Sequence, residues 1–146
     1  MRQASIEDAP RLVALMREFY AESATPFDPT AAANAFAALL SDDRLGAVWL
    51  IQAGDNKVGY VVVTFSYSME FSGRNGFLDD LFIRPSFRGA GLGTAALAEV
   101  RAFCVERGVR ALHLETGRDN VAAQALYRRA GFVATDRQLL TLVLPR

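Results

Sequence analysis

The sequence predicts one α/β (α+β) domain in which about four helices flank a mixed, mostly antiparallel sheet of about six or seven strands. Two observations support this prediction. The 146 residues can bury one sizeable core but are too few for two ordinary domains, so residues 1–146 are expected to form a single domain. Strand-like runs also stand before and after a central strand, helix and strand, an order typical of a mixed sheet covered by helices.

The helices are predicted from apolar residues at helical spacing and from capping residues at their starts. Ser5 is followed three positions later by a carboxylate, and Asp28 with Pro29 suits an N-cap and a first turn. Gly108 and Gly131 suit the ends of the last two helices. The four predicted helices cover residues 5–23, 28–43, 92–107 and 120–130.

The strands are predicted from runs of β-branched and aromatic residues between turn residues. Gly54, Asp55 and Asn56 separate the first two runs and predict a hairpin. Pro85 ends the third run because its missing N–H cannot continue a ladder. After a few extended residues at the N-terminus, the predicted strands cover residues 47–54, 57–69, 76–85, 110–116, 132–136 and 138–145.

Composition narrows the function classes. The chain is 51% apolar and 22% charged, and no apolar run approaches the roughly 20 residues of a membrane span, so no membrane partner is expected. The first ten residues carry carboxylates and no apolar segment, which argues against a signal peptide. The single Cys104 lies in a helical apolar pattern and suits a buried thiol in the reducing cytoplasm. No basic stripe with interleaved aromatics indicates nucleic-acid binding, and no metal site is predicted.

The charges are unevenly distributed although the net charge is zero. Residues 1–80 hold 6 basic and 11 acidic side chains, and residues 81–146 hold 10 basic and 5 acidic ones. An acidic first half and a basic second half suit a protein that holds a cationic and an anionic ligand together, although two solvated faces give the same pattern.

The segment SFRGAGLGTAAL, residues 86–97, places three glycines at alternate positions before a helix. A P-loop is excluded, because it needs a Gly-Lys pair and the only lysine is Lys57. Gly91, Gly93 and Ala96 match a dinucleotide fingerprint, but the five residues RPSFR separate the strand from the first glycine, where the fingerprint needs a tight turn. A third interpretation of this segment is a plain turn from a strand into a helix. The favoured interpretation is a nest of backbone N–H groups that binds a pyrophosphate, with Arg84 and Arg88 adding positive charge.

Two motifs resemble those of the GNAT superfamily of N-acyltransferases. Arg88-x-x-Gly91-x-Gly93 resembles its acetyl-CoA signature and follows a strand ending in LFIRP. Downstream, the block from Asn120 to Phe132 is similar to the family pattern N-x-x-A-x-x-L-Y-x-x-x-G-F. The order of predicted elements also agrees, so the resemblance covers essentially the whole chain.

The resemblance implies acetyl-CoA as acyl donor and a sheet that splays between its fourth and fifth strands. The pantetheine arm is then expected along the fourth strand, with a backbone N–H of Leu81 or Ile83 stabilising the oxyanion. Asn120 would position pantetheine, or it would serve only as a helix N-cap. The residues expected to bind the cofactor are Leu81, Phe82, Ile83, Arg88, Gly89, Ala90, Gly91, Leu92, Gly93, Thr94, Asn120 and Tyr127.

Acetyl transfer to an amine needs a group that accepts a proton, because an aliphatic amine with a pKa near 10.4 is protonated at pH 7. Asp79 and Asp80 are adjacent on one predicted strand, so regular alternation puts them on opposite faces. Asp79 is the favoured base, because the related family members carry a Glu at that position. Asp is shorter, so a relay through water is expected. Asp80, His113 and Glu115 are the alternatives.

Tyr127 is the expected general acid, since the resemblance places a tyrosine there near the thioester sulfur. Its alternative role is packing beside Leu126. Asp79, Asp80 and Tyr127 therefore form the predicted catalytic set.

The acceptor is expected to be a small cationic amine. The stretch from Phe65 to Ile83 is similar to that of diamine and small-amine N-acetyltransferases, and Glu70, Phe71, Asp79 and Asp80 are the predicted acceptor-binding residues. A protein or peptide N-acetyltransferase, and a non-catalytic acyl-CoA sensor, are the alternatives. A homodimer is expected from the resemblance, with the apolar run LLTLVLP as an interface strand or a core strand.

Overall fold

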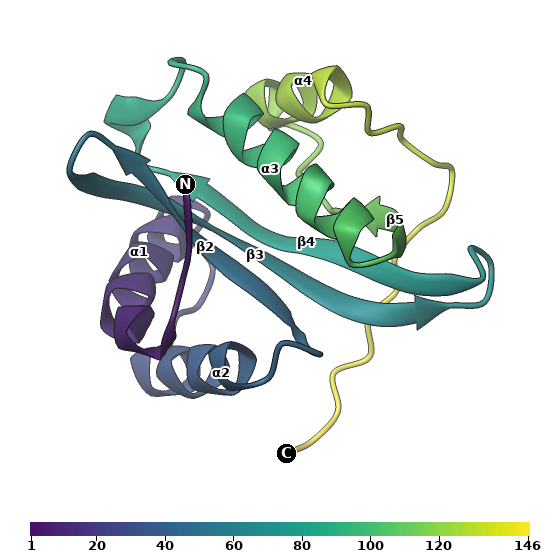
Figure 1. Ribbon diagram of the computed structural model, residues 1–146, viewed down its shortest axis with the longest axis horizontal. Coiled ribbons are helices and arrows are strands. Elements are labelled where there is room, and N and C mark those ends of the chain that lie inside the picture. Colours follow the sequence, from purple (N-terminus) through teal and green to yellow (C-terminus); the bar gives the residue numbers. More distant parts are fainter.

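The computed structural model describes residues 1–146 and contains one sheet of five strands in the order β1-β2-β3-β4-β5 (Figure 1). The first four strands are antiparallel neighbours, and β5 runs parallel to β4. This mixed, mostly antiparallel sheet with helices on both faces confirms the predicted fold class. The strands are β1 (Arg2–Gln3), β2 (Gly46–Ala53), β3 (Asn56–Ser68), β4 (Gly73–Ile83) and β5 (Val109–His113).

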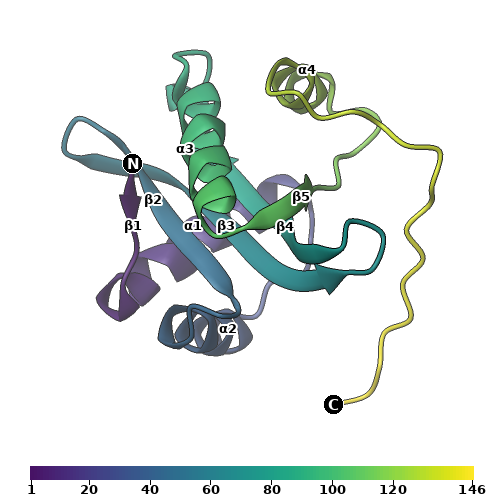
Figure 2. The same ribbon diagram turned by 45° about the vertical axis from the view of Figure 1, so that its right-hand side comes forward.

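Four α-helices cover the two faces of the sheet. α1 and α2 lie on one face, and α3 lies on the other with α4 beside it (Figures 1 and 2). Asp28 caps α2 by accepting hydrogen bonds from the backbone N–H groups of Thr30 and Ala31, as predicted. The helices are α1 (Ala9–Glu22), α2 (Pro29–Ser41), α3 (Leu92–Glu106) and α4 (Val121–Arg129), with 3₁₀ turns η1 (Ile6–Asp8) and η2 (Pro85–Phe87). None of these helices combines the length and apolar character that a membrane crossing requires.

The sheet separates two hydrophobic clusters. The first lies between the sheet and α3 and includes Trp49, Leu78 and Val100. The second lies under α1 and α2 and includes Leu12 and Phe36. Successive residues alternate between the two clusters along residues 47–51 of β2 and residues 60–63 of β3, which is the period-two pattern of a strand buried on both faces.

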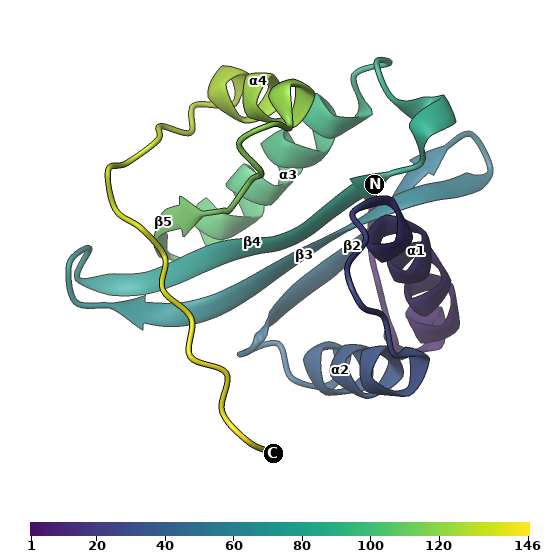
Figure 3. The ribbon, with the colours of Figure 1, turned by 180° about the vertical axis from the view of Figure 1, so that it is seen from behind.

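The sheet has fewer strands than the sequence predicts. The runs at residues 132–136 and 138–145 form no strand, and β5 ends at His113 instead of reaching residue 116. After α4 the chain leaves the domain in an extended path, so these residues have no neighbouring strand to pair with (Figure 3). High β-propensity alone does not make a strand, because the ladder needs a partner.

Candidate active site

A gap opens between β4 and β5. Their parallel pairing covers only Arg74 to Phe77 of β4, and β5 ends opposite Phe77. From Leu78 to Ile83, β4 therefore has β3 on one side and no strand on the other. The N–H of Arg84 donates to Val58 of β3, so by alternation the N–H groups of Leu81 and Ile83 face the gap. The expected splay is thus present, with two backbone donors aimed into it.

The glycine loop provides a row of free backbone donors at the start of α3. The N–H groups of Gly89 to Thr94 have no hydrogen-bond acceptor within the chain, and no side chain caps the helix. Gly89 has a φ of 79° and Gly91 a φ of 86°, and a Cβ built on either would meet nothing within 4 Å. These six donors lie at the positive end of a helix dipole, with open space at Gly89 and Gly91, and such a row suits a diphosphate.

Gly93 has a different role from its two neighbours. A Cβ at Gly93 would lie 3.0 Å from Cδ2 of Leu126, so this glycine allows α4 to pack closely on α3. The missing side chain of Gly93 therefore serves a helix contact, and its part in binding a phosphate stays a prediction.

Arg84 and Arg88 are held by α1 and do not point along the row of donors. Arg84 pairs with Glu18 at 2.9 Å, and Arg88 pairs with Glu22 at 2.8 Å while its Nε donates to the carbonyl of Ile83. Both arginines thus fix the β4–α3 loop against α1. A direct contact between Arg88 and a diphosphate stays a prediction.

A β-bulge changes the expected placement of the two aspartates. Val62 pairs with Asp80 while Val63 pairs with Leu78, so Asp79 is an extra residue in β4. Leu78 belongs to the α3-side cluster and Leu81 packs against the same cluster, which regular alternation would not allow. The expectation that Asp79 and Asp80 point to opposite faces is therefore wrong.

Asp80 lies in a buried, tyrosine-lined environment. Tyr60 is fully buried, and its hydroxyl donates to Oδ2 of Asp80 at 2.7 Å. Burial raises the pKa of Asp80 to about 6, with the hydrogen bond from Tyr60 opposing and the charge of Asp79 adding to this shift. Asp79 is exposed, and partial desolvation also raises its pKa.

The same two carboxylates act on Tyr20 of α1. Burial and then the charges of Asp80 and Asp79 raise the pKa of Tyr20 to about 12, and burial with the same charges raises the pKa of Tyr60. Two neutral phenols therefore stand beside two carboxylates, a combination suited to binding a cation. Tyr20 and Tyr60 were not predicted as site residues, because their places in apolar patterns indicated core positions.

Tyr127 lies on the other side of the sheet. It packs against the α3-side cluster and meets Phe132 edge to face at 5.8 Å. Burial raises the pKa of this phenol above its ordinary value. Asn120 is the N-cap of α4, and its Oδ1 accepts from the N–H of Ala123 at 3.3 Å. Asp80 thus lies on the α1 side of the sheet and Tyr127 on its α3 side.

Glu70 and Phe71 belong to a separate cluster at the β3–β4 turn. Glu70 forms a two-bond ion pair with Arg137, and Phe71 lies 5.7 Å from the ring of His113, which hydrogen-bonds Asn75 at 2.8 Å. The length of β4 between this turn and Asp79 is about 20 Å, at roughly 3.3 Å per residue. Within one chain, the four predicted acceptor residues therefore fall into two groups.

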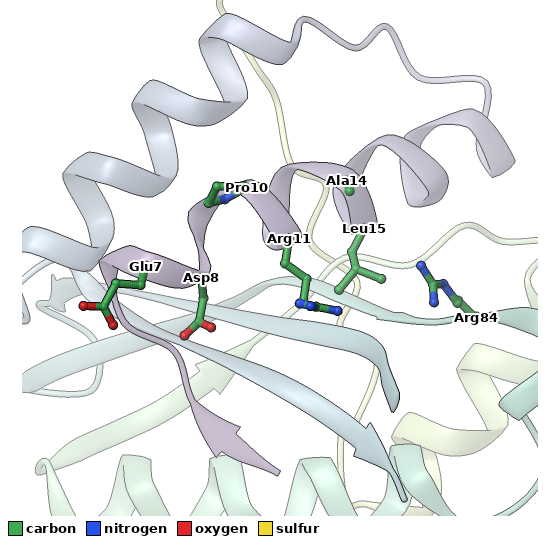
Figure 4. Close-up of a pocket in the computed structure, with 7 residues that line it drawn as sticks. All are labelled: Glu7, Asp8, Pro10, Arg11, Ala14, Leu15 and Arg84. Atoms are coloured by element: carbon green, nitrogen blue, oxygen red, sulfur yellow. The ribbon is translucent and has the colours of Figure 1, made fainter. Parts of the chain in front are cut away.

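A cavity of about 500 Å³ lies elsewhere, beside η1 and the first turns of α1. Of the residues expected to act in catalysis or cofactor binding, only Arg84, which was expected to add charge near the pyrophosphate, lines it. Figure 4 shows its wall, made by Glu7, Asp8, Pro10, Arg11, Ala14, Leu15 and Arg84.

Comparison with known proteins identifies the family. The family described as Acetyltransferase (GNAT) matches residues 12–132. The chain belongs to the GNAT acetyltransferase family. It is a GNAT-type N-acetyltransferase, and it is 30% identical over 141 residues to an aminoglycoside N(6')-acetyltransferase type 1 of Stenotrophomonas maltophilia, covering 94% of this chain and 88% of that protein.

The chain is also similar to a second acetyltransferase and to a solved structure. It is 35% identical over 74 residues to a thialysine N-epsilon-acetyltransferase of Bos taurus, covering 51% of this chain and 43% of that protein. The crystal structure of integron cassette protein HFX_CASS3, from the mobile metagenome of Cole Harbour Salt Marsh, is 47% identical with a TM-score of 0.90. That match covers 99% of this chain and 90% of the other, so the shared fold includes most of the residues after α4.

Proposed function

We propose that this GNAT enzyme transfers the acetyl group of acetyl-CoA to a primary amine of a small molecule with several positive charges, of the aminoglycoside or thialysine type. The observation that carries the proposal is the pair Asp79 and Asp80 beside two neutral tyrosines at one side of the β4–β5 gap. The names of the similar enzymes support the same acceptor class. A cytoplasmic location, with Cys104 buried and reduced, is part of this proposal.

In this proposal, acetyl-CoA supplies the activated acetyl thioester, and the free N–H groups of Gly89 to Thr94 hold its diphosphate. Leu81, Phe82 and Ile83 line the gap with the unpaired side of β4, where pantetheine amides find backbone partners. The backbone N–H of Leu81 or that of Ile83 stabilises the negative charge that develops on the carbonyl oxygen during attack.

Proton transfer is assigned to two residues on opposite sides of the gap. Asp80 is ionised above pH 6 and accepts the proton that the acceptor ammonium must lose. Tyr127, a neutral phenol at pH 7, donates a proton to the departing thiolate. Asp79 is more exposed than Asp80, so its proposed part is to attract the cationic acceptor.

A thiol-release assay with acetyl-CoA tests the proposal. The panel contains aminoglycosides, thialysine, polyamines, single amino acids and basic peptides, each at matched concentration. The expected result is a kcat/KM for an aminoglycoside or thialysine that exceeds the value for peptides. A higher kcat/KM for peptides would show that the acceptor is a peptide and not a small amine. CoA binding with no thiol release from any amine would indicate a sensor.

A further inference from the structure

The cavity beside η1 and the first turns of α1 has no part in the proposed function. Its volume of about 500 Å³ falls within the roughly 300–1,000 Å³ of small-molecule sites. Most such sites are mainly apolar, whereas only two of the seven residues that line this cavity are hydrophobic. The walls therefore suit a strongly polar molecule.

The charged side chains of this cavity are sorted by sign. Figure 4 shows the carboxylates of Glu7 and Asp8 at one end of the wall. The guanidinium groups of Arg11 and Arg84 lie at the other end. The side chains of Glu7 and Arg11 point away from each other in this view. The cavity thus has an acidic end and a basic end.

Two of these four charges already have partners within the chain. Asp8 accepts two hydrogen bonds of 2.9 Å from Arg2, which hold the pKa of Asp8 at about 2. Arg84 pairs with Glu18 at 2.9 Å and donates to the carbonyl of Lys57 at 3.4 Å. These two side chains are therefore fixed parts of the wall.

The other two charges, on Glu7 and Arg11, have no charged partner. Neither side chain takes part in any ion pair of the chain. Glu7 has only a weak contact from the hydroxyl of Ser5 at 3.4 Å. Arg17 on the same helix lies over the ring of Phe27 at 5.2 Å, and Arg11 has no such ring beneath it. One free carboxylate and one free guanidinium therefore remain at opposite ends of the cavity.

A zwitterion whose two charges lie many bonds apart fits this arrangement. An ammonium suits Glu7, and a carboxylate suits Arg11, whose planar guanidinium donates two parallel hydrogen bonds to such a group. A simple anion would gain only at the basic end, and a simple cation only at the acidic end. A single α-amino acid carries both charges on one carbon, so it cannot meet two groups that point apart. A short peptide with free termini carries one charge at each end.

We propose that this cavity binds a short peptide of about two to four residues, with its terminal ammonium on Glu7 and its terminal carboxylate on Arg11. Arg84 adds donors to the same carboxylate, because its contacts with Glu18 and Lys57 use only three of its N–H groups. None of these contacts involves the gap between β4 and β5. The peptide site is therefore independent of the amine that the enzyme acetylates.

Three peptides of equal length test the two contacts separately. Triglycine carries both terminal charges, N-acetyltriglycine lacks the ammonium, and triglycine amide lacks the carboxylate. No turnover occurs without acetyl-CoA, so the Kd of each peptide is measured by titration of the ¹H–¹⁵N NMR spectrum of the full chain. Triglycine is expected to bind in the millimolar range. Its Kd should be about fivefold lower than either of the others, because partly exposed charge pairs contribute about that factor.

Variants that remove one charge assign each contact. Glu7→Gln is expected to bind triglycine and N-acetyltriglycine equally. Arg11→Gln is expected to bind triglycine and triglycine amide equally. Glu106→Gln and Arg101→Gln, which remove exposed charges from α3, are the matched controls and should keep both fivefold differences.

The same spectra show where the peptide binds. The largest shifts are expected for backbone amides between Asp8 and Leu15. Shifts confined to Asp79 and Asp80 would mean that the peptide binds as an acceptor. Equal Kd values for the three peptides would mean that the termini are not recognised. Either result overturns the proposal, as does a spectrum that triglycine leaves unchanged.

Discussion

Asp79 and Asp80 are neighbours with different surroundings, and this difference makes them a matched pair for mutation. Asp80 accepts a hydrogen bond from the hydroxyl of buried Tyr60 and has a pKa of about 6, whereas Asp79 is exposed. Asp80→Asn retains an acceptor for Tyr60 but cannot take up a proton. We therefore expect kcat/KM to fall about 10²-fold, and the rise of kcat/KM through pH 6 to disappear, in a pH profile measured with the amine well below its KM.

Asp79→Asn is the control for this prediction. This substitution removes one negative charge of the same pair. It should therefore raise KM for the amine and leave the rise of the pH profile near pH 6 in place. If Asp79→Asn abolishes the rise near pH 6 and Asp80→Asn keeps it, the base is Asp79, as the family resemblance alone implies.

Removal of the hydroxyl oxygen of Tyr127 separates its proposed role as a general acid from its packing role. Tyr127→Phe preserves the edge-to-face contact with Phe132, so the thermal midpoint should change little. If the hydroxyl protonates the departing thiolate, kcat falls about 10²-fold while KM for acetyl-CoA stays close to its original value. A variant with full kcat would assign Tyr127 to packing, and stopped-flow thiol release with a matched melting curve distinguishes the two.

At the residue level, the sequence predicted the site better where a motif defines the backbone than where a side chain must be placed. The N–H groups of Gly89 to Thr94 are unpaired, as a phosphate nest requires. The positions of Asp79 and Asp80 could not be predicted, because one bulge residue reverses the alternation on which the argument rested. Tyr60 was missed for a related reason: a buried tyrosine in a strand looks like core until its hydroxyl partner is known.

The β4–α3 loop offers a test at the level of one element. Gly91 and Gly108 stand at opposite ends of α3, with φ values of 86° and 73°, and a Cβ on either would touch nothing. Alanine at either position should cost a similar 1–2 kcal/mol of backbone strain. Only Gly91 lies in the row of free donors, so Gly91→Ala should raise the Kd for CoA about tenfold by calorimetry.

Gly108→Ala is the control for the loss of stability that Gly91→Ala also causes. It should lower the free energy of unfolding by a similar amount and leave the Kd for CoA unchanged. Equal Kd changes in the two variants would mean that the donor row is not where CoA binds.

Elements with strong local signals were predictable, and those that depend on a distant partner were not. The caps and apolar spacing of α1 to α4 lie within each segment, and the helices form close to the predicted places. The runs at 132–136 and 138–145 have the composition of strands, but no strand of the same chain lies beside them. Composition indicates that a segment can pair, and only the arrangement of the whole molecule decides with what.

On the scale of the whole molecule, the raised pKa of Asp80 makes stability depend on pH. A carboxyl with a pKa of about 6 in the folded chain and about 3.9 in the unfolded chain binds more protons when folded between these values. The free energy of unfolding therefore falls as pH rises from 4.5 to 7, by about 2 kcal/mol at 1.36 kcal/mol per pKa unit.

Urea unfolding followed by the fluorescence of Trp49, the single and buried tryptophan, measures this slope at fixed protein concentration. Asp80→Asn cannot ionise, so it should flatten the slope and be more stable than the unmodified chain at pH 7, with little difference near pH 4.5. Asp42, whose pKa is lowered to about 2 by its hydrogen bonds with Arg44, titrates below this window, so Asp42→Asn should leave the slope unchanged. An Asp80→Asn variant that keeps the full slope would place the proton uptake elsewhere and remove the basis for Asp80 as a base active near pH 6.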